Sequence, residues 1–274
     1  MIVFPNAKIN LGLNVLARRA DGYNDIESIL VPIPLHDVLE AVVDPSLAPN
    51  ELVYTRSGLS IPGDPKTDLC YKAVRRIQVD RTLPGLRLHL HKVVPMGAGL
   101  GGGSSDGTHT LLLVNALCDL RIQHEQLSTI ALELGSDCPF FLWNEVCIAR
   151  GRGEQLTPIR LDLTGLWLVL ANPGVHVSTG EVYKSTTPTN VPWDFDSIAH
   201  RDRMPEWNKG LRNTMEAYVL RNYAMVAELK EVLGKAGAAY ATMSGSGSSV
   251  LGLFKDDPGN LSFPPGTSSW RMKL

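Results

Sequence analysis

One short glycine-rich run constrains this chain more than any other part of its sequence. Residues 95–105 read PMGAGLGGGSS, and five of the seven positions from Gly97 to Gly103 are glycine. Glycine adopts positive φ at little cost and lets the backbone approach a bulky group closely. An alternating strand pattern at 86–94 precedes the run, and an apolar helical stretch at 105–120 follows it. Because the first amides of a helix suit an anion, this run is predicted to bind phosphate.

The spacing of these glycines separates the run from two other phosphate loops. A Walker A loop requires lysine directly after its last glycine, and Gly103 occupies that position here. The dinucleotide pattern GxGxxG is present at Gly97, Gly99 and Gly102, but the preceding strand alternates instead of being apolar throughout. Asp119 also falls at a helix end and not at the tip of a second strand. Both alternatives are therefore disfavoured, and a plain turn would not need five glycines.

The remaining composition is that of an ordinary globular protein. The chain has 274 residues, of which 44% are hydrophobic and 20% are charged, so it can bury a substantial core. A formal net charge of −2 offers no electrostatic basis for binding nucleic acid or an anionic membrane. There is no signal-peptide pattern, no window of about 20 apolar residues and no CxxC pair. These observations predict a cytoplasmic protein with reduced cysteines and without nucleic-acid or membrane partners.

A strand near the amino terminus carries two polar side chains on one face. Residues 9–15 alternate between apolar and polar types, which is typical of a half-buried strand. Lys8 and Asn10 are two residues apart, so their side chains point the same way at a spacing of roughly 7 Å. A solvated lysine on an exposed face and a lysine in a shared polar site both fit this pattern.

Two capping patterns and a second glycine-rich run lie in the second half of the chain. Ser178 begins an S-x-x-E capping box, and Asn213 begins a similar N-x-x-E pattern, so a helix is expected to start at each. Residues 244–249 read SGSGSS and lie between strand-like segments at 239–243 and 250–254. Strands and helices thus alternate without a repeat, and the chain is predicted to be an α+β protein of two lobes.

Several stretches of the sequence together resemble one family. Residues 95–106 resemble the central motif of the GHMP kinases, the superfamily of galactokinase, homoserine kinase, mevalonate kinase and phosphomevalonate kinase. AKINL at 7–11 with RADGY at 19–23, LGSDCPFF at 134–141 and MSGSGSS at 243–249 resemble its 4-diphosphocytidyl-2-C-methyl-D-erythritol kinases, which serve non-mevalonate isoprenoid synthesis. These motifs follow one another in the order and at the spacing of the family, and together they span nearly the whole chain.

The resemblance implies a fold and a reaction. The fold would be two-lobed, with mixed and antiparallel sheets, helices, and an active site in the cleft between the lobes. The amino-terminal lobe, 1–155, would hold the ATP-phosphate loop and the catalytic residues, and the carboxy-terminal lobe, 156–274, the second glycine-serine loop. The enzyme would use ATP and Mg²⁺ to phosphorylate the 2-hydroxyl of the cytidylyl diphosphate alcohol, as a monomer or weak homodimer.

The resemblance also assigns residues to the two substrates. Lys8 and Asp137 match the catalytic lysine and aspartate, which would stabilise the moving phosphoryl group and accept the hydroxyl proton. From its local sequence alone, Asp137 could instead cap a short helix. The residues expected to hold ATP are Pro95, Met96, Gly97, Ala98, Gly99, Leu100, Gly101, Gly102, Gly103, Ser104 and Ser105. Those expected to bind the cytidylyl substrate are Asn10, Tyr23, Asn24, Tyr183, Ser244, Gly245, Ser246 and Gly247. No carboxylate ligand for magnesium can be assigned, although the hydroxyl of Ser104 or Ser105 could approach the ion.

Base recognition is where the chain departs from the family. Tyr23 and Tyr183 match the two positions whose aromatic rings enclose the cytosine. The family usually has histidine after the Gly-Tyr pair, and this chain has Asn24, whose amide can also donate and accept hydrogen bonds. A second departure is the proline-rich segment 255–270, which is predicted to lack the helix that the family usually has there.

Two alternative functions remain open. A sister kinase acting on homoserine, mevalonate or a sugar is disfavoured, because such substrates offer no base to Tyr23 and Tyr183. A catalytically inactive nucleotide-binding sensor or scaffold is disfavoured by the presence of both Lys8 and Asp137, although Asn24 leaves it open.

Overall fold

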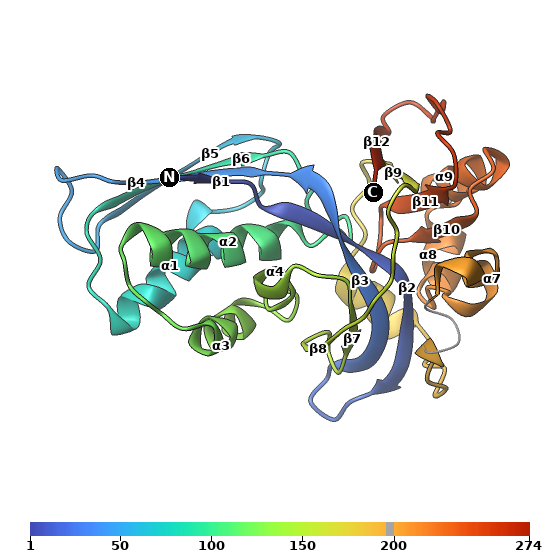
Figure 1. Cartoon of the computed structure of the whole chain (residues 1–274), viewed down its shortest axis with the longest axis horizontal. Helices are drawn as coiled ribbons and strands as arrows, with labels where there is room; N and C mark the ends of the chain where they lie inside the picture. Colours follow the sequence, from blue (N-terminus) through green and yellow to red (C-terminus); the bar gives the residue numbers. More distant parts are fainter. Residues whose placement is uncertain (196–199) are drawn as a thin grey trace. The chain divides into compact units, whose positions relative to one another are not determined.

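The computed structural model describes residues 1–195 and 200–274, in which groups of strands and groups of helices follow one another along the chain (Figure 1). The chain packs as two units. The first comprises Met1–Ala7, Leu35–Met96 and Gly101–Asn144, and the second comprises Lys8–Pro34, Gly97–Leu100 and Glu145–Leu274. These packing units do not follow the boundary expected at residue 155. The reason is that Leu13, Val15 and Ile26, from the amino-terminal strands, belong to the hydrophobic core of the second unit.

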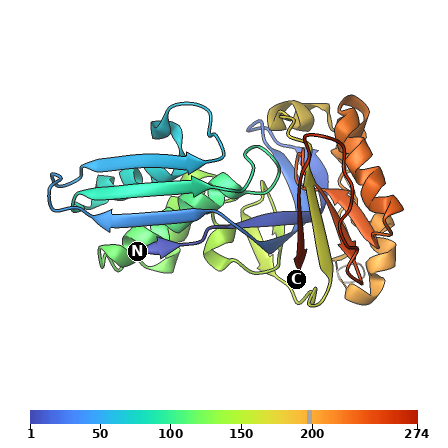
Figure 2. The same cartoon turned by 90° about the horizontal axis from the view of Figure 1, so that it is seen from above.

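The first unit is a four-stranded sheet covered by helices. Its strands β1 (Ile2–Val3), β4 (Val38–Val43), β6 (Leu86–Lys92) and β5 (Leu52–Gly58) lie side by side in that order, as Figure 2 shows. The β5–β6 pair is parallel, and the other pairs are antiparallel. The other elements are η1 (Pro65–Thr67), α1 (Leu69–Asp80), α2 (Gly102–Leu117), α3 (His124–Leu134) and α4 (Phe140–Trp143).

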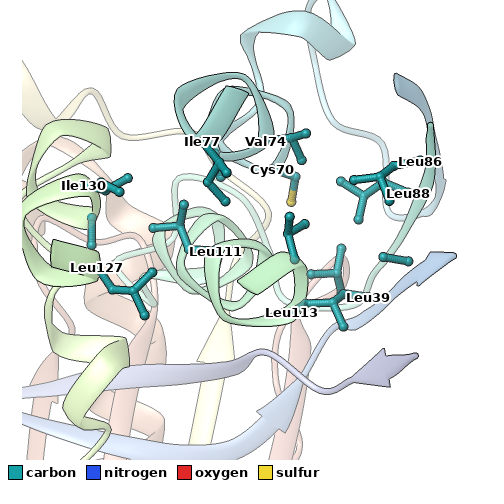
Figure 3. Packing of buried hydrophobic residues seen from close by; sticks show 14 of the residues in the cluster. Leu39, Cys70, Val74, Ile77, Leu86, Leu88, Leu111, Leu113, Leu127 and Ile130 are labelled. Atoms are coloured by element: carbon teal, nitrogen blue, oxygen red, sulfur yellow. The ribbon is translucent and has the colours of Figure 1, made fainter. Parts of the chain in front are cut away.

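The alternation along β6 produces the core of this unit. Leu86, Leu88 and Leu90 are buried, whereas Arg87 and His91, on the other face of the strand, are exposed and His89 is partly exposed. Figure 3 shows the leucines of the sheet packed against side chains of α1 and α2, with α3 on the far side of α2. The strand that precedes the glycine run is therefore half-buried, as its pattern predicted.

The second unit contains two sheets. One has the order β2 (Asn6–Arg18), β3 (Asn24–His36), β7 (Cys147–Arg150) and β8 (Gln155–Pro158), with the first residues of β2 and the last of β3 belonging to the first unit. The other is antiparallel, in the order β10 (Tyr240–Met243), β11 (Val250–Phe254), β9 (Trp167–Asn172) and β12 (Ser268–Lys273). The helical elements are α5 (Thr179–Ser185), η2 (Arg201–Arg203), α7 (Met204–Gly210), α8 (Glu216–Asn222) and α9 (Ala224–Lys235).

The two expected helix starts have different outcomes. The Ser178 side chain accepts a hydrogen bond from the Glu181 amide and α5 begins at Thr179, so this prediction is confirmed. At the second, Asn213 Oδ1 accepts a hydrogen bond from the Met215 amide at 3.0 Å, as a capping side chain does, but the helix α8 begins only at Glu216. The Nδ2 of Asn213 donates to the carbonyl oxygens of Met243 and Gly245, so this side chain also supports a distant loop.

Other expectations hold. The α+β class with mixed and antiparallel sheets is confirmed. Residues 255–267 contain no helix, as their prolines predicted. The cysteines Cys70, Cys118, Cys138 and Cys147 are free thiols. Within 1–195 and 200–274, every helix is too short or too polar to cross a lipid bilayer.

Candidate active site

Lys8 lies beside the glycine run in the second unit, and its side chain is buried. β2 was expected to be half-buried, but its residues from Asn6 to Val15 are buried on both faces, and Lys8 is only 4% exposed. The Lys8 backbone amide donates to the Leu100 carbonyl at 2.9 Å. Its Nζ donates to Asn10 Oδ1 at 2.6 Å and to the Gly99 carbonyl at 3.3 Å. The polar face of the strand is thus covered by the loop, and Lys8 is not a solvated surface lysine.

Asn10 holds the Lys8 ammonium in place. The Asn10 Nδ2 donates to Ser28 Oγ at 2.7 Å, and Ser28 Oγ donates to the Gly12 carbonyl at 2.7 Å. These bonds fix the orientation of the Asn10 amide, so that its oxygen faces Lys8. Substrate binding by Asn10 stays a prediction, and the structure adds that its amide oxygen accepts a hydrogen bond from Lys8. The sequence offered no signal for Ser28, which lies on the neighbouring strand.

The two glycine loops pack directly against each other in the second unit. Ser244 Oγ donates to the Gly99 carbonyl at 2.8 Å, and the Ser249 amide donates to the Ala98 carbonyl at 3.3 Å. Gly99 has φ +76°, and a Cβ on it would lie 1.9 Å from the Ser244 carbonyl oxygen. Only glycine fits at this position, since the second loop occupies the space that a side chain would need.

The second glycine loop, residues 244–249, is held by two side chains that its sequence did not indicate, Asn172 and Thr179. Asn172 Nδ2 donates to the hydroxyls of Ser248 and Ser249 at 3.3 and 3.0 Å. The Thr179 and Ser246 hydroxyls lie within hydrogen-bond distance at 2.9 Å. Each partner is more than 60 residues from the loop in sequence, so no local pattern could have indicated it.

The start of α2 presents backbone amides without a cap. Gly101, at the N-cap position, has left-handed φ of +67° and makes no side-chain capping bond. A Cβ on Gly103 would meet nothing within 4 Å, so the space beside the first turn is open. Ser105 is fully buried, with its Oγ 3.2 Å from His109 Nδ1, whereas Ser104 is only partly buried. Open space and uncapped amides at a helix start are what a phosphate group requires.

Asp137 lies in the first unit, in the turn between α3 and α4. α4 begins at Phe140, and Pro139, at its N-cap position, makes no side-chain capping bond. Thr108 on α2 donates through Oγ1 to the Cys138 carbonyl at 2.9 Å. Burial raises the pKa of the Cys138 thiol to about 11, so this side chain is a neutral packing group. The helix that follows the glycine run therefore also holds the turn that carries Asp137.

The predicted base-binding residues lie in the second unit. Tyr23 follows a turn in which its amide donates to Asp21 Oδ1 at 3.1 Å, and it is 54% exposed. The Arg152 guanidinium carbon lies 4.6 Å from the centroid of the Tyr23 ring, a cation–π contact that the sequence did not reveal. The buried Asn24 Oδ1 accepts no hydrogen bond from the described residues. Tyr183 is half-buried and packs against the core of this unit.

Comparison with known proteins assigns the family. The chain matches the family models "GHMP kinases N terminal domain" over residues 68–145 and "GHMP kinases C terminal" over 197–261. It is 42% identical, over 93% of its own length and 92% of the other, to a 4-diphosphocytidyl-2-C-methyl-D-erythritol kinase of Parabacteroides distasonis. The chain belongs to the GHMP kinase family. Within that family it groups with the 4-diphosphocytidyl-2-C-methyl-D-erythritol kinases, as its motifs indicated.

Solved structures agree with this assignment. A crystal structure of a 4-(cytidine 5'-diphospho)-2C-methyl-D-erythritol kinase is 31% identical and superposes with a TM-score of 0.77, covering 92% of this GHMP kinase and 90% of that chain. A homoserine kinase from Cytophaga hutchinsonii superposes with a TM-score of 0.74 at 14% identity, covering 100% and 94% of the two chains, and so shares the fold. The protein is therefore a small-molecule kinase of the GHMP fold.

Proposed function

We propose that this GHMP kinase transfers the γ-phosphate of ATP to the 2-hydroxyl of 4-diphosphocytidyl-2-C-methyl-D-erythritol. The observation that carries the proposal is the buried Lys8 ammonium, which Asn10 and the Gly99 carbonyl hold beside the glycine loop. Phosphoryl transfer needs positioned cations and hydrogen-bond donors more than covalent chemistry, because charge spreads over the oxygens of the moving group. The site supplies them with one lysine, loop amides and serine hydroxyls.

In the proposed reaction, Asp137 accepts the proton of the substrate hydroxyl as that oxygen bonds to the γ-phosphorus. The bond between the γ-phosphorus and the β–γ bridging oxygen breaks, which releases ADP. The Lys8 ammonium would stabilise the charge on the transferred group and favour ionisation of the hydroxyl. The amides at the start of α2 bind the ATP phosphates.

Magnesium belongs to the same proposal. Bound with ATP, it would neutralise phosphate charge during transfer. Magnesium usually keeps several waters and binds through substrate phosphates, with few protein ligands. The described part of the chain fits this mode, since no three of its His, Cys, Asp or Glu side chains cluster as a metal site would require. Ser104 lies in the first turn of α2 and is partly exposed, whereas Ser105 is buried, so Ser104 is the loop hydroxyl that we propose would approach the ion.

The decisive assay compares acceptors. With ATP and magnesium, the purified enzyme is expected to phosphorylate 4-diphosphocytidyl-2-C-methyl-D-erythritol and to leave homoserine and mevalonate unchanged. Turnover of homoserine or mevalonate without the cytidylyl substrate would establish a sister kinase. ATP binding without turnover of any acceptor would establish a sensor or scaffold. A cytoplasmic location, a monomeric or weakly dimeric state and the absence of nucleic-acid and membrane partners remain predictions.

Asn24→Ala is expected to raise KM for the cytidylyl substrate by about tenfold, with a smaller effect on kcat. The reason is that the Asn24 oxygen is buried without a hydrogen-bond partner in the described protein, so the exocyclic amine of a bound cytosine could satisfy it. Steady-state kinetics at saturating ATP measure the effect, and KM for ATP serves as the internal control. An unchanged KM for the cytidylyl substrate would show that this side chain does not contact the base.

A further inference from the structure

A buried ion cluster lies at the base of the glycine loop, in the first unit. It consists of Asp37, Lys92 and Asp106, and we call it the loop-base cluster. Lys92 Nζ donates to Asp37 Oδ2 at 2.5 Å and to Asp106 Oδ2 at 2.6 Å. The side chains of Lys92 and Asp37 are 0% exposed and that of Asp106 is 4% exposed, so water does not solvate these charges.

The cluster contacts the chain directly before the glycine loop. Lys92 is the last residue of β6, and the next two residues lead into Pro95. Asp37 Oδ1 accepts hydrogen bonds from the amides of Val93 at 2.5 Å and Val94 at 2.8 Å. One carboxylate therefore fixes both the lysine and the backbone that enters the loop.

The cluster also contacts the chain directly after the loop. Asp106 lies in the second turn of α2, and Lys92 reaches it from β6. A Cβ on Gly102 would lie 2.9 Å from Lys92 Nζ, so the ammonium sits against the first residue of the helix. The two ends of the loop, at Val94 and at Gly102, are thus joined through a single lysine.

Stability alone does not account for such a cluster. The free energy lost when charges are removed from water offsets much of their mutual attraction. Well-packed apolar side chains can therefore often replace a buried ion pair without loss of stability. Asp106 shows this cost directly, because its Oδ1 is buried and accepts no hydrogen bond from the described residues. Hydrogen bonds between charged side chains are directional, so they fix the geometry between the elements that carry them. Apolar side chains do not supply this constraint.

We propose that Asp37, Lys92 and Asp106 are positioning residues for ATP, which hold the end of β6 and the start of α2 at the separation the phosphates require. The inference rests on the proposed binding of ATP phosphates by this loop. None of the three side chains needs to touch ATP. Amides that bind phosphate must be placed within a fraction of an ångström, and a misplacement of about 1 Å can cost about 100-fold in rate.

Asp106→Leu tests the link between the two ends. It removes the bond from Lys92 to α2 and leaves Lys92 paired with Asp37, so no charge is stranded. We expect the Kd of AMP-PNP with magnesium, measured by calorimetry, to rise about tenfold. Asp106→Asn keeps an oxygen for Lys92 and is expected to weaken binding only about twofold. As a matched control, Asp68→Leu removes the acid of the Arg56–Asp68 ion pair in the same unit and should leave the Kd unchanged.

A second variant covers the case in which Asp106→Leu fails to fold. The triple replacement Asp37→Asn, Lys92→Met and Asp106→Leu removes all three charges but retains an oxygen for the amides of Val93 and Val94. It should unfold at or above the wild-type Tm, because it buries no ions, and should still bind AMP-PNP about tenfold more weakly. A folded variant of either kind with wild-type Kd would overturn the proposal.

The readouts separate this inference from the proposed reaction. AMP-PNP binding needs no acceptor substrate, so the measurement is informative even if the cytidylyl alcohol is not phosphorylated. If it is phosphorylated, KM for that substrate should stay within about twofold of wild type in Asp106→Leu. An equal rise in KM for both substrates would indicate general disruption of the fold and would contradict a role at the ATP loop.

Discussion

Asp137→Asn is expected to lower kcat by about 10²- to 10⁴-fold, the usual contribution of a positioned base. Asparagine has the same shape but cannot accept the proton of the substrate hydroxyl. The fold should be retained, because asparagine keeps the shape of the side chain and the turn is held through the backbone of Cys138. KM for ATP and for the cytidylyl substrate should change much less than kcat, since the interaction acts in the transition state.

The matched control for this variant is Asp119→Asn. Asp119 is 76% exposed, follows the end of α2 and has a left-handed φ of 46°, which asparagine also tolerates. It should retain wild-type kcat, so that loss of activity in Asp137→Asn cannot be attributed to loss of an acid in general. If both variants turn over within a few-fold of wild type, Asp137 is not the proton acceptor.

Local patterns in the sequence predicted the elements on either side of the phosphate loop. The alternation of β6 and the apolar stretch of α2 depend on neighbours within a few residues, and both elements form where they were expected. The capping box at Ser178 is local in the same sense. The family motifs added Lys8, Asp137 and the second glycine loop, and membership of the family is confirmed by relatives that span nearly the whole chain.

What local patterns could not predict was the long-range partner of each site residue. The alternation of apolar and polar residues along β2 implied that one face of the strand is exposed to solvent. The loop segments at 97–100 and 244–249 cover that face and bury Lys8. Asn213 has the sequence of a helix cap, yet its amide bonds to a loop 30 residues away. The loop-base cluster is the clearest case. Asp37 and Lys92 are 55 residues apart and look like surface charges in the sequence, and it is the pairing of β4 with β6 that brings them together as a buried pair.

The burial of Lys8 leads to the second large effect. Lys8→Met keeps the length of the side chain and removes its charge. We expect kcat to fall by about 10²- to 10³-fold, the loss typical when one donor to a developing charge is removed. The variant should also be less stable by about 1–3 kcal/mol, because Asn10 Oδ1 and the Gly99 carbonyl each lose a charged donor in a buried place and keep only the Ser244 hydroxyl.

The kinetic and stability effects can be separated, because kcat is measured on folded enzyme at saturating substrates and stability by urea unfolding. Lys235→Met is the control, since that lysine is 74% exposed and pairs with Glu231 on the surface of α9. A Lys8→Met enzyme that is destabilised but keeps its kcat would show that Lys8 merely joins β2 to the glycine loop. The opposite result, a large loss of kcat with KM for ATP nearly unchanged, is what charge stabilisation in the transition state requires. It would place the reacting phosphoryl group beside the ammonium that Asn10 and Gly99 hold.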